Sequence, residues 1–350
     1  MSREQDKTSA TPLGIWGAGR LLLQALSEQE ECLRSVYGIA AQIVRPPAGS
    51  PPEYAVRLGE IPAAFYSARK NIFSTLFYST YLALDIPRPR RLLYGKLNHL
   101  FRIWVTSADN LLDAEDKCVL PLEMPGGSRV MREVVALMAA DRVLRRLLAE
   151  AVAAGTLTAP QADRISDESL RCLLPSAAQE ASEEGGVTVR PAPAYVLDTV
   201  HVLKTGLLFN IPFPGVDIVE EDVDRDRLGR IKQALLLFGC GCQVLDDIRD
   251  LARDLVERRH NYLLSVLARE QPEQLSQWAA RDIKAGDRLY FEVLPAALAA
   301  ARLGYQRLAS ACTVLQEERV ILSGAPVAQM ACSMFTVLDL EDLSHASSFV

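Results

Sequence analysis

Aspartates recur at one-turn spacing in the C-terminal half of the chain. Asp246, Asp250 and Asp254 follow one another at intervals of four residues. Because four residues of an α-helix rotate by about 400°, each step drifts by only about 40°, and the three carboxylates line one ridge. The preceding apolar segment contains Gly239 and Gly241, which would let a neighbouring element approach closely. Carboxylates in such a row suit a hard divalent cation such as Mg²⁺, which also binds the phosphate oxygens of a substrate.

A second pair of aspartates has the same spacing earlier in the chain. Asp109 and Asp113 are four residues apart, at the end of the apolar segment 97–105. Taken alone, this pair also fits an exposed acidic helix end, and the later row also fits a solvated face whose acids pair with Arg249 and Arg253. Two apolar helices that both end in same-face aspartates are less expected by chance. Facing each other across a bundle, the two rows could hold several Mg²⁺ ions and stabilise a departing diphosphate.

Fixed positive charges for the same anion occur in two places. Lys204 lies inside the apolar segment 203–209, and Arg258 and Arg259 follow the later aspartate row. A lysine inside an apolar helix is costly unless its charge is paired. Two interpretations of Lys204 remain open: it binds a phosphate, or its ammonium reaches past the helix end to water.

The elements that position these residues are predicted to be helices. Apolar side chains recur at three- and four-residue steps, and no sustained strand alternation is evident. The segments with this period are 21–44, 63–84, 92–112, 130–154, 194–209, 228–255, 261–267, 289–308 and 327–338. We therefore expect an all-α fold with a flexible N-terminal tail over 1–15. The rest, 16–350, is expected to form one large helical bundle around a central apolar cavity.

The composition of the chain argues against several classes of protein, including nucleic-acid-binding and membrane proteins. The chain has 350 residues, 49% of them hydrophobic, and a formal net charge of −6. A nucleic-acid partner, which requires a basic surface, is therefore not expected. Apolar runs are too short for an integral membrane segment, and the polar N-terminus carries no secretory signal. The seven cysteines are scattered and the four histidines form no zinc motif, which together predict a cytoplasmic protein with reduced thiols.

Two motifs together resemble the trans-prenyltransferase branch of the class I isoprenoid (terpene) synthases. The first is Lys204-Thr205-Gly206-Leu-Leu-Phe. The second begins at Gln243 and reads Gln-Val-Leu-Asp-Asp-Ile-Arg-Asp-Leu-Ala-Arg-Asp, ending at Asp254. The family carries a Lys-Thr helix followed by a Gln-x-x-DDxxDxxxD helix, and the resemblance spans roughly residues 60–265.

The earlier aspartates extend this resemblance, with departures. Asp109-Asn110-x-x-Asp113 stands in the place of the family's first acid motif, DDxxD, with Asn at the second position. A chain-elongating synthase usually also has a Gly-Gly-Lys-Arg segment and a pair of arginines after this motif. The corresponding stretches here are 67–71 (Ser-Ala-Arg-Lys-Asn) and 117–119 (Lys-Cys-Val). Both parts of an isopentenyl diphosphate site are therefore missing.

With these departures, the resemblance implies a Mg²⁺-dependent terpene synthase or cyclase. Such an enzyme would ionise one allylic prenyl diphosphate of C15 to C25 and release a hydrocarbon or terpene alcohol together with diphosphate. Two alternatives remain open. One is a prenyl diphosphate synthase, by chain elongation or by head-to-head condensation of the squalene/phytoene type, and the other is a catalytically silent regulatory subunit. The allylic substrate is the expected partner, and a homodimer is left open.

The resemblance also implies a site with three groups of residues. About three Mg²⁺ ions would be held by the carboxylates of Asp109, Asp113, Asp246, Asp250 and Asp254. The first four of these aspartates are also predicted to be catalytic. Cationic and hydroxyl side chains would bind the diphosphate: Lys204, Arg259, Tyr262 and Arg69. The pocket would be lined by Phe73, Phe77, Tyr81, Trp104, Phe209 and Gln243. Aromatic faces can stabilise a carbocation, and the alternative for each aromatic residue is that it fills the core.

Overall fold

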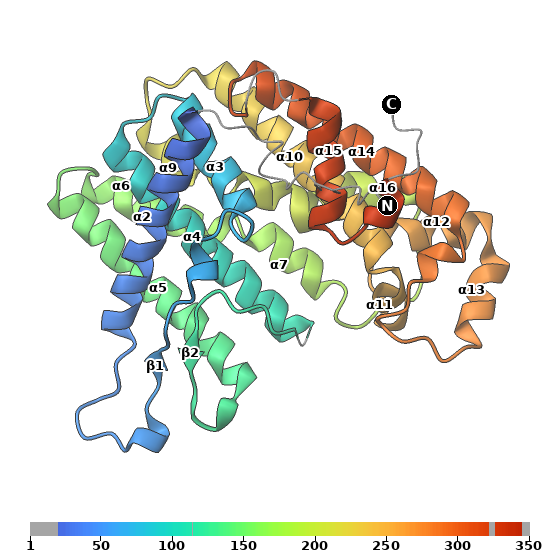
Figure 1. Cartoon of the computed structure of the whole chain (residues 1–350), viewed down its shortest axis with the longest axis horizontal. Coiled ribbons are helices and arrows are strands. Elements are labelled where there is room, and N and C mark those ends of the chain that lie inside the picture. The colour runs from blue at the N-terminus through green and yellow to red at the C-terminus, as the bar shows by residue number, and fades with distance from the viewer. Residues whose placement is uncertain (1–19, 114, 322–325, 345–350) are drawn as a thin grey trace, which may run out of the picture. The chain divides into compact units, whose positions relative to one another are not determined.

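The computed structural model describes residues 20–113, 115–321 and 326–344, and these are mostly helical, with two short strands (Figure 1). The predicted all-α fold is confirmed. The predicted tail, 1–15, lies outside the described residues. The chain divides into two compact units: unit 1 (Cys172–Asn210 and Asp224–Val350) and unit 2 (Gly19–Arg171 and Ile211–Val223). The single domain expected over 16–350 stays a prediction.

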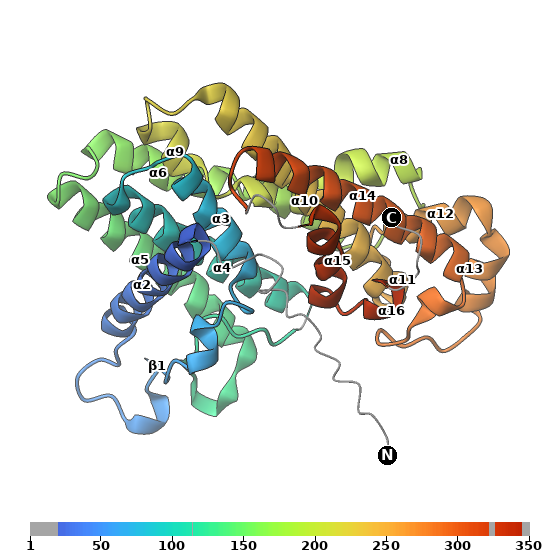
Figure 2. The same ribbon diagram turned by 45° about the horizontal axis from the view of Figure 1, so that its top comes forward.

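Unit 2 is a helical bundle with one short sheet. Helix α4 packs against α5 and α2, and α3 packs against α2 and α4 (Figure 2). The strands β1 and β2 pair antiparallel, with Arg57 opposite Glu123. The elements of unit 2 are α2 (Arg20–Ile43), β1 (Arg57–Leu58), α3 (Ile72–Ala83), α4 (Arg88–Leu112), β2 (Leu122–Glu123), α5 (Arg129–Ala153), α6 (Ala159–Arg171) and α9 (Pro214–Val219).

A buried carboxylate ties three helices of unit 2 together. Glu28 on α2 accepts hydrogen bonds from the Tyr78 hydroxyl on α3 at 2.5 Å and from Arg91 on α4 at 2.8 and 3.0 Å. Burial acts to raise the pKa of Glu28, but the hydrogen bonds from Arg91, Gln24 and Tyr78 outweigh it and lower the pKa to about 2. Glu28 is therefore ionised and paired, which is the condition under which a buried charge is tolerated.

Unit 1 is built around α10 and α14, which lie side by side. A π-helical stretch over Val196–Val200 and Val202–Gly206, followed by a 3₁₀ turn over Leu207–Asn210, also packs against α10. The helices of unit 1 are α7 (Leu174–Ala181), α8 (Pro193–Tyr195), α10 (Arg225–Arg249), α11 (Leu251–Val256), α12 (Tyr262–Glu270), α13 (Pro272–Ala279), α14 (Leu294–Glu317), α15 (Val327–Val337) and α16 (Glu341–Ser344).

Glycines on α10 let its neighbours approach closely, as the sequence predicted. A Cβ at Gly241 would lie 3.2 Å from the backbone oxygen of Gly304 on α14, and a Cβ at Gly304 would lie 3.3 Å from that of Gly241. A Cβ at Gly239 would lie 2.6 Å from the ring of Phe209. The absence of side chains at these positions brings α14 and the turn after the π-helical stretch against α10.

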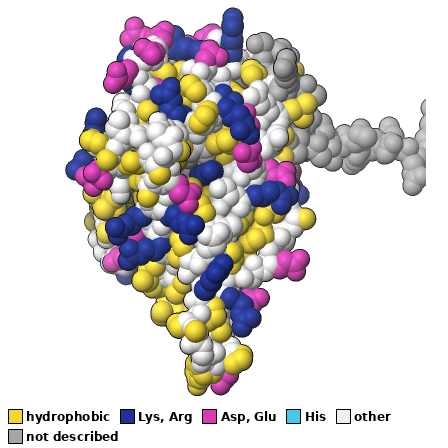
Figure 3. Space-filling model, turned by 90° about the vertical axis from the view of Figure 1, so that its left-hand side faces the viewer, with side chains coloured by type: hydrophobic (Ala, Val, Ile, Leu, Met, Phe, Trp, Pro, Cys, Tyr) yellow, Lys and Arg dark blue, Asp and Glu magenta, His cyan; other side chains and the backbone are white. Residues whose placement is uncertain are grey.

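The surface shows charges of both signs. On the face drawn in Figure 3, Lys and Arg side chains are interspersed with Asp, Glu and hydrophobic ones. In the part of the chain that the structure describes, no helix is long and apolar enough to cross a membrane.

Gly239→Ala tests the close packing of Phe209 on α10. The added Cβ cannot fit 2.6 Å from the ring, so we expect the free energy of unfolding to fall by about 1–3 kcal/mol. Gly229→Ala is the matched control on the same helix, because nothing lies within 4 Å of its added Cβ. That change should raise stability by up to about 1 kcal/mol. Urea unfolding followed by circular dichroism measures both, and equal effects would contradict the packing.

Candidate functional site

The Lys-Thr motif lies in a π-helical stretch that contacts α10. Such stretches are rare and occur frequently at functional sites. A Cβ at Gly206 would lie 2.9 Å from the Cys240 sulfur, so the glycine permits the close approach. As a result, the Thr205 hydroxyl donates a hydrogen bond to the Gln243 side chain on α10. Gln243, predicted as a pocket residue, is buried and links the Lys-Thr motif to the aspartate motif.

Asp247 forms the centre of a buried polar network in unit 1. Its side chain is 3% exposed. Gln243 donates to Asp247 Oδ1 at 3.0 Å, and the backbone amide of Tyr262 donates to Oδ2 at 2.5 Å. The buried ring of His201 places Nε2 2.9 Å from the same oxygen. Asp247, absent from the predicted ligands, therefore joins the π-helical stretch, α10 and the start of α12.

Asp246 and Asp250 are the more accessible members of the predicted row, with 31% and 14% of their side chains exposed. Arg249 binds Asp250 through Nε at 2.9 Å and Nη2 at 2.8 Å, and it also pairs with Asp246. Arg253 donates to Asp250 Oδ2 at 2.5 Å. The i,i+3 pairs that the sequence left open are therefore formed, on a surface that is partly buried rather than fully solvated.

Asp254 has a different environment from the other two acids of the row. Helix α10 ends at Arg249 and α11 begins at Leu251, but the Asp254 amide still donates to the Asp250 carbonyl at 2.8 Å, as the Asp250 amide does to the Asp246 carbonyl. The buried side chain of Asn261 donates to Asp254 Oδ2 at 2.8 Å. Burial, together with the negative charge of Asp247, raises the pKa of Asp254 well above its usual range. Its predicted role as a metal ligand stays a prediction.

Two predicted diphosphate-binding cations share one carboxylate that the sequence analysis missed. Lys204 Nζ lies 3.2 Å from Glu180 Oε1, and Arg259 Nη1 lies 3.6 Å from Glu180 Oε2. Burial acts to lower the pKa of Lys204, but the charges of Glu183 and Glu180 outweigh it and raise the pKa. Lys204 is therefore a protonated lysine that is paired with Glu180 on α7 and 24% exposed, and both interpretations of its role stay predictions.

Hydrogen bonds join the turn that contains Arg259 to the segment that follows α7. The Val187 amide donates to the Arg258 carbonyl at 2.6 Å, and the His260 amide donates to Glu183 Oε2 at 2.9 Å. Arg190 donates to the Arg259 carbonyl. These bonds hold the backbone of Arg259 in place next to α7.

Tyr262 lies at the edge of this group. Its amide binds Asp247, while its half-buried side chain lines a pocket of about 340 Å³ that also includes Pro193, Arg269 and Glu270. Burial raises the pKa of Tyr262. Its predicted contact with diphosphate stays a prediction.

The earlier acid motif belongs to unit 2. Asp109 lies on the last turn of α4, and its carbonyl accepts the Asp113 amide at 2.8 Å. Asn110 is buried, and its side chain both accepts from and donates to the backbone of Lys117, at 3.0 Å each. Asn110 therefore closes the turn after α4. Each acid cluster is described within its own unit, and their predicted opposition across a cavity stays a prediction.

The other predicted residues are distributed over both units. Tyr81 is fully buried, with its hydroxyl donating to the Pro212 carbonyl at 2.8 Å, and Phe77 is buried beside it in α3. Phe209 is buried against α10, as the core-filling alternative expects. Trp104 and Phe73 are half-buried, and Arg69 is exposed before α3. Their predicted roles in a pocket or a diphosphate site stay predictions.

Several proteins of known structure share the fold of this chain at low sequence identity. No protein-family model matches the sequence, and no curated protein matches it significantly. Geranylgeranyl pyrophosphate synthase from Lactobacillus brevis aligns with 88% of this chain and 96% of its own, with a TM-score of 0.58 and 12% identity. Decaprenyl diphosphate synthase from Rhodobacter capsulatus aligns with 91% of this chain and 98% of its own, with a TM-score of 0.57 and 13% identity. Heptaprenyl diphosphate synthase from Staphylococcus aureus aligns with 89% of this chain and 98% of its own, with a TM-score of 0.56 and 12% identity.

These matches confirm the predicted fold. The chain has the all-α class I isoprenoid synthase fold, and its structural neighbours are trans-prenyltransferases.

Asp254→Asn tests the buried carboxyl through the pH dependence of stability. The unfolded chain releases this proton at about pH 4, whereas the folded protein holds it to higher pH because burial raises the pKa of Asp254. The free energy of unfolding therefore falls as pH rises from about 4 through the raised pKa. The fall should be smaller in the variant, as measured by urea unfolding at several pH values. Equal slopes in both proteins would show that Asp254 ionises normally.

Proposed function

We propose that this protein binds an allylic prenyl diphosphate together with Mg²⁺ and breaks its carbon–oxygen bond, with transfer of the prenyl group as the reaction. One observation carries the proposal: in unit 1, a hydrogen-bonded chain connects the segment that contains Lys204 to the helix that carries Asp246. Thr205, next to Lys204, binds Gln243, and Gln243 binds Asp247 beside the row. The fold shared with prenyl diphosphate synthases supports prenyl transfer over the cyclase reaction that the sequence favoured.

Mg²⁺ is the cofactor that the proposal requires, and Asp246 and Asp250 fit it in donor type. They are partly exposed carboxylates one helical turn apart, and Mg²⁺ usually takes one or two carboxylates together with water and substrate phosphate. Over the described residues, no group of three or more His, Cys, Asp or Glu side chains is arranged to hold a metal ion. The fit is therefore to a pair of carboxylates rather than to a complete protein cage.

The cations of unit 1 suit the diphosphate. When bound, Mg²⁺ supplies Lewis acidity that favours departure of the diphosphate. Lys204 retains its proton, and both Lys204 and Arg259 pair with the carboxylate of Glu180, while Arg259 also pairs with Glu257 at 3.7 Å. A diphosphate carries more charge and more acceptor oxygens than one carboxylate, so it can replace Glu180 as the partner of both cations. Lys204 and Arg259 would then hold the leaving group while the carbon–oxygen bond breaks.

Terpene cyclisation is the second candidate, because residues for a second diphosphate are missing from the sequence. The stretch 67–71 lacks the Gly-Gly-Lys-Arg pattern, and Lys117 replaces the expected arginine pair. Arg69 and Lys70 are exposed, and the Lys70 ammonium lies over the Phe65 ring at 4.5 Å. An enzyme without the second diphosphate site would ionise one substrate and let its cation cyclise or lose a proton.

Product analysis separates these reactions. Purified protein is incubated with Mg²⁺ and allylic diphosphates from C10 to C25, with and without isopentenyl diphosphate, and the products are identified by mass spectrometry. We expect a longer prenyl diphosphate that appears only with isopentenyl diphosphate. A hydrocarbon or terpene alcohol formed without it would establish the cyclase reaction instead. Absence of any turnover, with intact fold by circular dichroism, would contradict both and support a catalytically silent subunit.

Asp250→Asn tests the aspartate row directly. Asp250 would hold the Mg²⁺ ion that stabilises the departing diphosphate, and loss of one group on which such stabilisation depends costs about 100-fold or more in turnover, so we expect a loss of this size in product formation. Asp226→Asn is the control, because Asp226 is an exposed acid in the first turn of the same helix. Equal turnover in the two variants would remove Asp250 from the site.

A further inference from the structure

An arginine lies within the aspartate row, where its charge competes with that of a metal ion. Arg249 follows Asp246 by three residues and precedes Asp250 by one. Its Nε and Nη2 atoms bind the two oxygens of Asp250 at 2.9 and 2.8 Å, and Nη2 also pairs with Asp246. This planar two-point contact is the strongest form of arginine–carboxylate pairing. One guanidinium therefore neutralises the same two carboxylates that the proposed function assigns to Mg²⁺.

Other neighbours reinforce this occupation of the carboxylates. Arg253 donates to Asp250 Oδ2 at 2.5 Å, so this oxygen accepts from two guanidiniums. The Gln243 amide lies 3.5 Å from Asp246 Oδ2. A cation that binds the row must therefore exchange with Arg249 rather than enter an unpaired acidic pocket. The cost of that exchange lowers the affinity of the row for a metal ion.

Once released from the carboxylates, the Arg249 guanidinium can bind the phosphate oxygens of a diphosphate. Arg249 is 30% exposed, so its side chain is not locked in the core. Arginine binds phosphate oxygens in the same two-point geometry that it uses for carboxylates. When a diphosphate is present, Arg249 can exchange the carboxylates for phosphate oxygens, and the carboxylates then accept the metal ion. The two binding events favour each other, as linkage requires.

We propose that Arg249 is a built-in counter-ion that keeps the metal affinity of Asp246 and Asp250 low until a diphosphate is bound. This inference rests on the proposed function for the identity of the ligands, and on the contacts of Arg249 for the coupling between them. It predicts changes of opposite sign for the two ligands when Arg249 is replaced. A residue that served only to stabilise the helix would weaken the binding of both.

The experiment compares wild type with Arg249→Gln in two binding assays. In the first, Mn²⁺ alone is titrated as a probe for Mg²⁺, and free Mn²⁺ is measured by electron paramagnetic resonance. We expect the variant to bind Mn²⁺ about tenfold more tightly, within the usual range of coupling between linked sites. In the second, binding of labelled pyrophosphate at saturating Mg²⁺ is measured by equilibrium dialysis. Here we expect the variant to bind more weakly than wild type.

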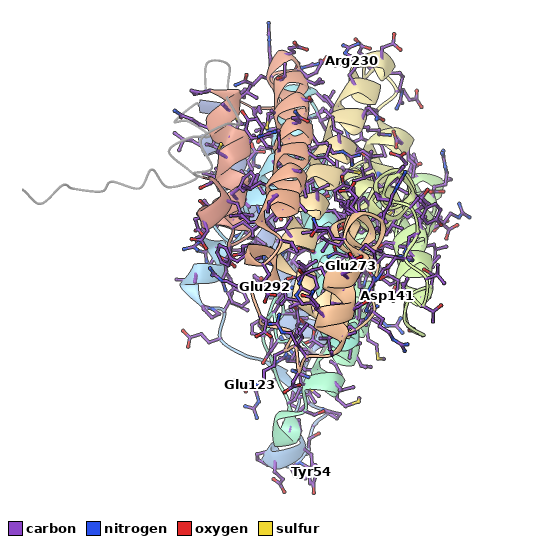
Figure 4. The ribbon with its side chains drawn as sticks, turned by 90° about the vertical axis from the view of Figure 1, so that its right-hand side faces the viewer. Tyr54, Glu123, Asp141, Arg230, Glu273 and Glu292 are labelled. Atoms are coloured by element: carbon purple, nitrogen blue, oxygen red, sulfur yellow. The ribbon has the colours of Figure 1, made fainter. Side chains whose placement is uncertain are left out.

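The matched control is Arg230→Gln. Arg230 lies near the opposite end of α10, where Figure 4 labels it, and donates to Glu318 at 2.5 Å. It also loses an arginine–carboxylate pair on the same helix, but away from the row, so both affinities should equal those of wild type. Arg253→Gln is the second variant for the case in which Arg249→Gln fails to fold. It removes one of the two guanidiniums on Asp250 and should tighten Mn²⁺ binding by a smaller factor.

Two outcomes overturn the inference: unchanged Mn²⁺ affinity in Arg249→Gln, or pyrophosphate binding as tight as in wild type. Where Arg249→Gln does not fold, unchanged Mn²⁺ affinity in Arg253→Gln overturns it in the same way. The proposed function is judged separately, from product formation by wild type. If Arg249→Gln binds Mn²⁺ more tightly and pyrophosphate more weakly, but wild type forms no product, the inference stands and the proposed function is rejected. If wild type forms product, but Arg249→Gln binds both ligands as wild type does, the proposed function stands and the inference is rejected.

Discussion

The arrangement of unit 1 depends on the buried carboxylate of Asp247. A charge in this position is strongly destabilising unless its oxygens are bonded, and Asp247 is bonded from three directions, by Gln243, His201 and the Tyr262 amide. Because the partners come from the π-helical stretch, from α10 and from the start of α12, satisfying this one group fixes all three segments. Asp246, one residue earlier on the helix, is rotated by about 100° from it and remains accessible.

The sequence predicts the parts of this arrangement that depend on local periodicity. The one-turn spacing placed Asp246 and Asp250 together, and the i,i+3 spacing anticipated their pairing with Arg249 and Arg253. The same spacing continues to Asp254, whose amide donates to the Asp250 carbonyl at 2.8 Å, but it does not predict that Asp254 is buried and accepts a hydrogen bond from Asn261. Burial of a carboxylate by a segment that comes later in the chain leaves no mark in apolar spacing.

Contacts between residues far apart in the chain were beyond sequence reasoning. His201 and Asp247 are 46 residues apart, and Glu180 meets Lys204 across a polar segment that reads as an ordinary loop. The π-helical stretch was equally hidden, since its sequence has the apolar character of an α-helix. For the same reason, the sequence indicates that Lys204 needs a partner for its charge, but only the structure identifies that partner as Glu180 on α7.

Pairing of charges within the protein affects how each proposed binding residue can meet its ligand. In unit 1, cations proposed for the substrate face Glu180, and carboxylates proposed for the metal face Arg249, so binding there is an exchange of partners and its strength is the difference between two pairings. In unit 2, Asn110 both donates to and accepts from the Lys117 backbone, and an ionised aspartate cannot donate. The asparagine is therefore required by the turn that it closes. The earlier motif consequently has two carboxylates, Asp109 and Asp113, where the pattern that it resembles has three, and this departure follows from the hydrogen bonds of the turn.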